Sequence, residues 1–282
     1  MRVAEIPSIA ANGMNMPALG LGTWQLSPDT VEAIVPVALE AGYRHIDTAQ
    51  IYHNEQAVGK AVDESDVDRG EIFITTKIWP DHFAPEDFFA SLHQSLERLR
   101  SDYVDLLLLH WPVFDGHGMN ETLEALMRAR LDGLARYIGI SNFNIDQTEQ
   151  AVAFCGEGAL STSQVEYHVY LAQKRLRRVL ARNNLVLTAY MPLANAHAVN
   201  DPVLWEIGSQ YGKSAPQVAL RWLVEQDRVA AIPATSNPHH AKANSEIFDF
   251  ALSAEDRQRI ANLARGMRLC QPQGLAPEWD ED

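Results

Sequence analysis

Four polar side chains lie at or just after the ends of short strand-like runs, where they could act together on a proton. Asp47 ends one such run, and Tyr52 follows it five residues later. Lys77 ends the next run, and His110 follows four consecutive leucines. Each residue taken alone is more often structural, as a helix cap, a packing residue, a solvated strand end or a core histidine. Their occurrence at three successive strand ends favours a shared chemical role.

These residue types suit the reduction of a carbonyl, which needs a hydride at carbon and a proton at oxygen. A tyrosine hydroxyl can give the proton, although its ordinary pKa is about 10. A lysine ammonium beside it favours the phenolate and lowers that pKa. An aspartate paired with the lysine keeps the ammonium charged and oriented. A neutral histidine can donate a hydrogen bond to the carbonyl oxygen and hold it beside the tyrosine.

Eight strand-like runs, separated by helical patterns, supply the elements that would position these groups. Apolar residues at helical spacing follow several runs. Helix starts are marked by Asn144 with Gln147 and Ser214 with Gln217, at capping-box spacing. The alternation predicts a (β/α)8 barrel, with an open doubly wound sheet as the alternative, and a single domain over residues 1–282. The runs are 19–22, 44–47, 72–77, 104–110, 137–141, 162–166, 186–190 and 229–233.

Two segments outside this alternation have their own predictions. Asn12-Gly13 lies at the centre of residues 9–16, and Asn-Gly is the strongest two-residue hairpin signal. A hairpin there could close the N-terminal end of the barrel. Residues 267–282 lack periodicity and contain Pro272, Pro277 and Trp279, so we expect a C-terminal loop that lies against the body.

Composition excludes several classes of protein. The 23 basic and 37 acidic residues give a formal net charge of −14, which argues against nucleic-acid binding and against docking on anionic membranes. We expect the two cysteines, Cys155 and Cys270, to be reduced, and no Cys or His spacing indicates a metal site. The first residues do not resemble a signal peptide, and no apolar run is long enough to span a bilayer. These features predict a cytoplasmic protein.

Six motifs that follow one another along the chain resemble those of the aldo-keto reductase family. The resemblance covers nearly the whole sequence, in order. The last residues, GLAPEWD at 274–280, are similar to a bacterial subgroup that reduces 2,5-diketo-D-gluconate and methylglyoxal. The motifs are GYRHIDTA at 42–49, YHNE at 52–55, TKIW at 76–79, LHWP at 109–112, GISNF at 139–143 and QVEY at 164–167.

The resemblance implies roles for individual residues. Tyr52 would be the general acid, Lys77 and Asp47 would tune it, and His110 would orient the carbonyl. The nicotinamide carboxamide would be held by Ser141, Asn142 and Gln164, and Tyr190 would stack on the nicotinamide ring. Other cofactor contacts would come from Thr23, Leu193, Asn195, Thr235, Ser236, His240 and Asn244. Trp24, Trp79 and Trp111 would wall the substrate pocket, although core packing is the alternative for each, above all for Trp111.

The choice between NADPH and NADH is predicted less sharply, because both positions of the family's 2′-phosphate clamp depart from its pattern. Ala234 stands where a lysine often contacts the 2′-phosphate of NADPH, and His240 stands where an arginine does. A neutral histidine cannot replace the bidentate arginine fork. The resemblance favours NADP(H), while these departures leave NAD(H) or the use of both open.

Two rival functions remain at this point. A nucleotide-binding regulatory protein could use the same scaffold, although the complete set of Tyr52, Lys77, Asp47 and His110 disfavours it. A different barrel enzyme, such as an isomerase, would not bind a nicotinamide cofactor. We expect a monomeric NAD(P)H-dependent oxidoreductase that reduces a small aldehyde or ketone.

Overall fold

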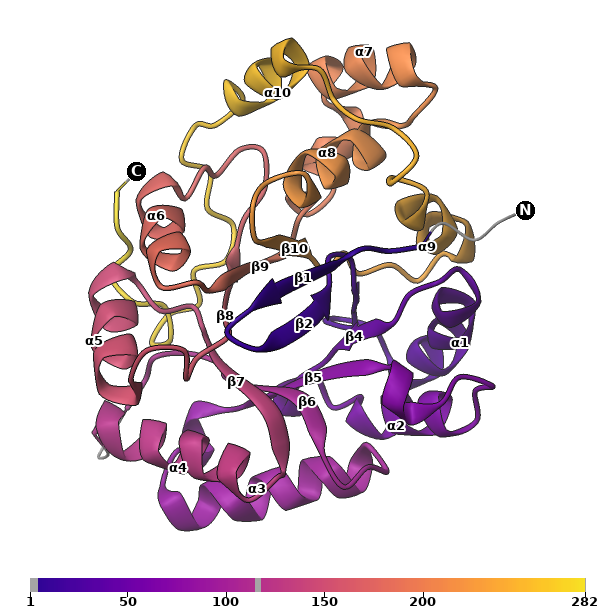
Figure 1. Ribbon diagram of the computed structural model, residues 1–282. Coiled ribbons are helices and arrows are strands. Elements are labelled where there is room, and N and C mark those ends of the chain that lie inside the picture. The colour runs from indigo at the N-terminus through magenta and orange to yellow at the C-terminus, as the bar shows by residue number, and fades with distance from the viewer. Residues whose placement is uncertain (1–4, 115–117, 282) are drawn as a thin grey trace.

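The chain folds around a sheet of eight parallel strands that follow one another in sequence order (Figure 1). The structure is a computed structural model that describes residues 5–114 and 118–281. Helices alternate with the strands and form an outer ring. The strands are β3 (Leu21–Gly22), β4 (His45–Asp47), β5 (Phe73–Ile78), β6 (Val104–Leu109), β7 (Ala135–Ser141), β8 (Thr162–Glu166), β9 (Val186–Tyr190) and β10 (Val229–Ala231).

The first and last strands join, so the sheet closes into a barrel. The Gly20 N–H donates to the Ala231 carbonyl at 2.9 Å, and the Gly22 N–H donates to the Pro233 carbonyl at 3.0 Å. A Cβ at Gly22 would come within 2.7 Å of the Ile232 oxygen, so only glycine allows this approach. The predicted (β/α)8 barrel is confirmed, and the open-sheet alternative is wrong.

The helices begin where the sequence places their caps. Both predicted capping boxes, Asn144 with Gln147 and Ser214 with Gln217, are formed. Single turns of 3-10 helix, η1 (Gln50–Tyr52), η2 (Arg69–Glu71), η3 (Pro80–His82) and η4 (His197–Asn200), lie in the loops. The α-helices are α1 (Pro28–Glu40), α2 (Glu55–Asp63), α3 (Pro85–Arg98), α4 (Met119–Leu131), α5 (Ile145–Cys155), α6 (Lys174–Arg182), α7 (Pro202–Tyr211), α8 (Ala215–Val224), α9 (Pro238–Ser245) and α10 (Ala254–Ala261).

A β-hairpin covers the end of the barrel at which the strands begin (Figure 1). Strands β1 (Ser8–Ala11) and β2 (Met14–Pro17) pair antiparallel. Asn12 and Gly13 have φ of 47° and 80°, the left-handed values that a tight two-residue hairpin turn requires. The hairpin's buried methionines lie in one apolar cluster with side chains of four barrel strands, which are Phe73, Leu106, Leu108, Val186 and Ala230. The predicted hairpin and its closing position are confirmed.

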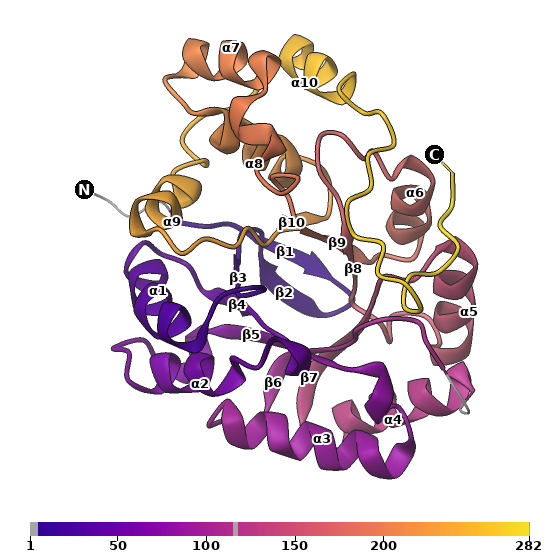
Figure 2. The same cartoon turned by 180° about the vertical axis from the view of Figure 1, so that it is seen from behind.

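The C-terminal segment lies across the body of the barrel, as predicted for a loop. We call residues 265–281 the C-terminal strap. Figure 2, which views the opposite end of the barrel, shows it in yellow beside β8. The strap is held by backbone bonds to Tyr170 and to Glu166. Among residues 5–114 and 118–281, no helix is long and apolar enough to cross a membrane.

Candidate active site

Polar side chains gather at the carboxyl ends of the strands because the strands are parallel and in register. Side-by-side residues of parallel strands point to the same face, as do residues two apart on one strand. Asp47 is paired with Thr75, which lies two residues before Lys77, so Asp47 and Lys77 both point into the barrel. Ser141 is paired with Gln164 in the same way. Six polar side chains therefore share this end of the barrel: Asp47, Lys77, His110, Ser141, Gln164 and Tyr190.

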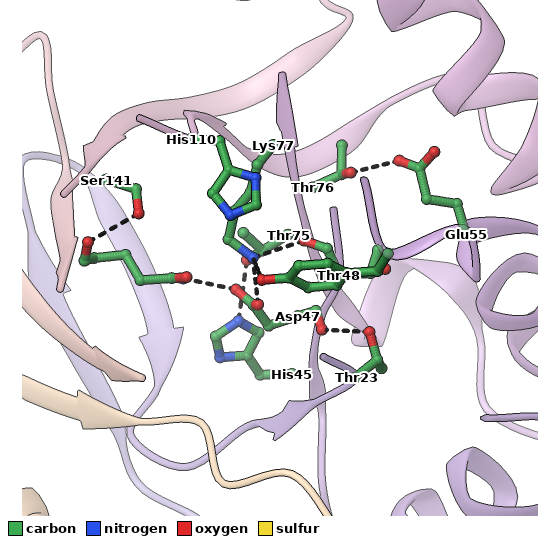
Figure 3. Close-up of polar contacts among 12 residues, drawn as sticks. Thr23, His45, Asp47, Thr48, Glu55, Thr75, Thr76, Lys77, His110 and Ser141 are labelled. Carbon is green, nitrogen blue, oxygen red and sulfur yellow. Dashed lines mark hydrogen bonds and ion pairs between the residues drawn. The ribbon is translucent and has the colours of Figure 1, made fainter. Parts of the chain in front are cut away.

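A buried ion pair forms the floor of this site. The Lys77 Nζ lies 2.5 Å from the Asp47 Oδ1, and the two side chains are 0% and 2% exposed (Figure 3). The same ammonium donates to the Thr48 carbonyl at 2.7 Å. Burial lowers the pKa of Lys77, and the Asp47 carboxylate opposes that shift. Asp47 thus holds the ammonium in one orientation and supports its charge.

Tyr52 reaches this pair from η1. The Lys77 Nζ lies 3.5 Å from the Tyr52 hydroxyl, the third polar group within its reach. Burial raises the pKa of Tyr52 well above its ordinary value of 10.0, and the charge of Asp47 adds to the increase. The lysine charge alone predicts a pKa below the ordinary value. The structure gives the opposite direction, because desolvation disfavours the phenolate and Asp47 offsets the lysine charge. Tyr52 is held as a neutral phenol, the form that can donate a proton.

His110 faces Tyr52 across the site. The ring centroids of His110 and Tyr52 are 5.7 Å apart in an edge-to-face arrangement. Burial lowers the pKa of His110 well below 6.5, and the charge of Lys77 lowers it further. The imidazole is therefore neutral. This is the form that the sequence analysis assigns to a histidine that donates a hydrogen bond to a carbonyl oxygen.

A continuous hydrogen-bond network connects the predicted carboxamide-binding residues to the ion pair. The Gln164 Nε2 donates to the Asp47 Oδ2 at 2.7 Å, so this carboxylate binds Lys77 with one oxygen and Gln164 with the other. The Ser141 hydroxyl donates to the Gln164 carbonyl, and the Asn142 amide donates to the Ser141 hydroxyl. The Tyr190 hydroxyl donates to the Asn142 Oδ1 at 2.7 Å. A group bound by these side chains would therefore be coupled to the Asp47–Lys77 pair.

The three tryptophans have different environments. Trp79 packs edge-to-face on His110, with centroids 5.2 Å apart. Trp111 is 5% exposed and stacks on the same ring at 6.5 Å. Trp24 is 41% exposed. Trp79 and Trp111 thus flank the imidazole from two directions, whereas Trp24 has much of its surface open to a ligand.

The remaining predicted cofactor residues lie at two places. Thr23 is buried, and its hydroxyl donates to the Asp47 carbonyl at 3.0 Å. The others are on the loops after β9 and β10 and on α9, away from the buried ion pair. In this group Asn195, Ser236 and His240 are exposed, Leu193 and Thr235 are half-buried, and Asn244 is buried.

Two residues near the reaction centre received no role from the sequence argument. Glu166 is fully buried at the end of β8 and binds the C-terminal strap. Cys270, on that strap, donates its backbone N–H to the Glu166 Oε2 at 2.8 Å. The sequence could have indicated a place for Glu166 in the site, because it lies two residues after Gln164 and so projects from the same face of the strand. Nothing local in the sequence places Cys270 beside Glu166.

The comparisons with known proteins agree with this geometry. The model of the aldo/keto reductase family matches residues 18–265. Methylglyoxal reductase DkgB of Escherichia coli O157:H7 is 42% identical over 268 residues, which cover 95% of this chain and 100% of that protein. Morphine 6-dehydrogenase of Pseudomonas putida is 38% identical over 274 residues, covering 92% and 91% of the two chains.

Two solved structures are similar over almost their whole length. A protein provisionally described as a 2,5-diketo-D-gluconic acid reductase B has a TM-score of 0.95 at 46% identity, covering 98% of both chains. An aldo-keto reductase complexed with NADPH has a TM-score of 0.89 at 32% identity, covering 95% of this chain and 90% of that one.

The chain belongs to the aldo-keto reductase family. It is an NAD(P)H-dependent oxidoreductase, similar to proteins named as methylglyoxal and 2,5-diketo-D-gluconate reductases.

Proposed function

We propose that this protein reduces small dicarbonyl compounds, such as methylglyoxal or 2,5-diketo-D-gluconate, with Tyr52 as the general acid. The observation that carries the proposal is the position of the half-buried Tyr52, whose hydroxyl lies 3.5 Å from the Lys77 ammonium that Asp47 holds. The similarity to methylglyoxal reductase DkgB supports the substrate class. We further propose that residues 1–282 act as one barrel domain.

The side chains at the strand ends fit a nicotinamide cofactor. A carboxamide both donates and accepts hydrogen bonds, and Asn142 and Gln164 carry side-chain amides of matching chemistry beside Ser141. Tyr190 is half-buried and can offer its aromatic face to a flat ring. A reduced nicotinamide, when bound, supplies the hydride.

The protein supplies the proton and the electrostatic support for the carbonyl oxygen. In the proposed reaction the carbonyl carbon gains the hydride while its oxygen gains the Tyr52 proton, which leaves an alcohol and a phenolate. Lys77 stabilises that phenolate, and Asp47 keeps Lys77 in place. His110, being neutral, donates a hydrogen bond to the carbonyl oxygen and aligns it with Tyr52. Solvent then returns the proton to Tyr52.

We propose that NADPH is the preferred cofactor, with weak discrimination against NADH. Thr235, Ser236 and His240 are half-buried or exposed beyond β10 and can contact a 2′-phosphate. Ala234 offers no charge there, and His240 offers a full charge only when protonated. The family habit and the NADPH complex of a structural relative support NADPH.

We also propose that the protein works as a monomer, without nucleic-acid or membrane partners. The net charge of −14 opposes binding to anionic polymers and surfaces. In the described part of the chain, the most exposed apolar side chains, Leu131 and Trp205, lie on different helices. Oligomers usually bury a broad apolar patch, which needs several such side chains together.

Steady-state oxidation of NADPH and of NADH, measured side by side with methylglyoxal and 2,5-diketo-D-gluconate, tests this proposal. We expect turnover with both cofactors and a higher kcat/KM with NADPH. Absence of turnover with both substrates, in a protein that binds NADPH, would contradict the proposed substrate class. Equal or better use of NADH would contradict the proposed cofactor preference.

A further inference from the structure

The C-terminal strap is attached to the barrel near its beginning, in its middle and near its end. Near its beginning, the Arg265 and Met267 N–H groups both donate to the Tyr170 carbonyl at 3.1 Å. Near its end, the Asp280 Oδ2 accepts the Ile145 N–H at 2.7 Å. Between them, the strap meets the carboxylate of Glu166. This middle attachment is the one beside the reaction centre.

The Glu166 carboxylate binds two consecutive N–H groups of the strap. The Leu269 N–H donates to the Oε1 at 2.7 Å, and the Cys270 N–H donates to the Oε2 at 2.8 Å. The His168 Nε2 lies 2.9 Å from the Oε1. Each carboxylate oxygen therefore has a strap partner, and the chain is fixed at two neighbouring peptide units.

This carboxylate is fully buried, which is unfavourable unless its charge is well hydrogen-bonded. Burial alone would raise the pKa of Glu166, but the bonds from His168 and from the Cys270 and Leu269 N–H groups together hold it below its ordinary value. Glu166 therefore stays ionised when it binds the strap. Two charge-assisted bonds to the strap backbone are stronger than two neutral ones.

The strand register explains why this attachment bears on the reaction. Glu166 is paired with Tyr190 across β8 and β9, so the two side chains leave the sheet on the same face. The Cys270 backbone binds the Glu166 carboxylate at 2.8 Å, so the strap at Cys270 lies over the face of the sheet from which Tyr190 also projects. Burial and the charge of Asp47 raise the pKa of Tyr52, and the charge of Cys270 adds to that increase.

We infer that Glu166 is a positioning residue that fixes the strap at Leu269 and Cys270 and thereby sets one wall of the carbonyl pocket. The inference rests on the proposed function, because it takes the space beside Tyr52 and Tyr190 as the reaction site. Glu166 acts through the strap and leaves the Asp47–Lys77–Tyr52 contacts untouched. Its loss should weaken carbonyl binding more than it slows the chemical step.

The test replaces Glu166 by glutamine, which keeps the shape but removes one acceptor oxygen. One strap N–H then faces an amide N–H2 group, and the strap can no longer be held at both peptides. We expect the KM for methylglyoxal to rise about tenfold while kcat stays within about twofold. The matched control is Asp280→Asn, which makes the same chemical change at the distant attachment to Ile145. We expect its KM to stay within about twofold of the parent value.

A second measurement does not depend on catalysis. In a Cys155→Ser background, the rate at which a disulfide reagent labels Cys270 reports how firmly the strap is seated. We expect Glu166→Gln to raise this rate about tenfold, and Asp280→Asn to leave it nearly unchanged. Should Glu166→Gln not fold, Glu166→Asp keeps the charge and shortens the side chain, and the same directions are expected.

The possible outcomes separate the two proposals. A rise in both the KM and the labelling rate, specific to position 166, supports the inference. An unchanged labelling rate overturns it, and so does an equal response in Asp280→Asn. A parent protein that turns over no carbonyl contradicts the proposed function, whereas the labelling experiment still decides whether Glu166 fixes the strap.

Discussion

The proposed reaction centre and the region where we propose that the 2′-phosphate binds lie at the same end of one barrel, yet they are built differently. At the reaction centre, Asp47 and Lys77 are buried and form their ion pair from neighbouring strands. In the 2′-phosphate region, Ala234, Ser236 and His240 are exposed on a loop and the first turn of a helix. The pairing of the barrel strands determines where Asp47 and Lys77 lie. Little of the fold depends on the exposed side chains of the second region.

Because the two regions are built differently, the chemistry of the enzyme and its cofactor preference can change independently. The side chains proposed to support proton transfer are paired and buried, so replacing Asp47 or Lys77 alone leaves its partner as an unpaired buried charge. The side chains proposed to contact the 2′-phosphate can be altered at little expense to stability, because exposed substitutions usually change the free energy of unfolding by less than about 0.5 kcal/mol. We therefore expect chemistry to be rigidly specified and cofactor preference to be adjustable.

The largest expected effect is that of Lys77→Met. It should lower kcat by about 10²- to 10⁴-fold, because the Tyr52 phenolate loses its cation. It should also lower the free energy of unfolding by about 3–5 kcal/mol, because Asp47 remains as an unpaired buried charge. Steady-state kinetics and denaturant unfolding measure the two effects.

A double variant separates these effects. Adding Asp47→Asn to Lys77→Met removes both charges and should restore much of the lost stability, since a buried pair is often replaceable by neutral groups. It should not restore turnover. Recovery of activity in the double variant would contradict the role proposed for Lys77.

A smaller loss is expected for His110→Ala. Removal of one preorganised hydrogen-bond donor to a reacting oxygen typically lowers kcat by about 10²- to 10³-fold. Affinity for NADPH should change little, because His110 contacts the aromatic rings of Tyr52, Trp79 and Trp111. Kinetics with fluorescence titration of NADPH separate the two. An equal loss of cofactor affinity would indicate a different role.

The exposed region should respond more mildly. Ala234→Lys together with His240→Arg adds two charged donors where the 2′-phosphate is proposed to bind. The ratio of kcat/KM for NADPH over NADH should rise about 10- to 100-fold, with the thermal midpoint nearly unchanged. An unchanged ratio would show that the phosphate binds elsewhere.

The pH dependence should be the least marked. Burial raises the pKa of Tyr52 above 10.0, so its proton-donating form persists at high pH and is lost only above that value. Burial lowers the pKa of His110 below 6.5, so the neutral imidazole persists as the pH falls through that value. The kcat/KM for reduction should therefore stay level between pH 6.5 and 10. A decline centred near 6.5 would show that His110 titrates normally.

Much of the fold followed from the sequence because its signals are local. Strands β8 and β9 begin and end at the predicted residues. Asn12-Gly13 forms the predicted turn because few other residues accept two left-handed conformations. The strand-like runs predicted to end at Asp47, Lys77 and His110 correspond to β4, β5 and β6, each of which ends within one residue of its predicted end.

The rest depends on contacts between distant segments. The bond between Glu166 and Cys270 joins residues 104 apart, and the strap that makes it has no periodic pattern. The pKa of Tyr52 depends on how completely the folded chain excludes water, which residue types alone do not give. The charge of Lys77 alone predicts a lowered pKa, and this direction is wrong because desolvation raises the pKa of Tyr52.

The role of Tyr52 as the proton donor is tested most directly by the turnover of Tyr52→Phe, measured together with the affinity of this variant for NADPH. The substitution removes one hydroxyl and keeps the ring. We predict that kcat for methylglyoxal falls by about 10²- to 10⁴-fold while the Kd for NADPH stays within about threefold. A residual kcat within tenfold of the parent value would contradict the assignment of Tyr52 as the proton donor.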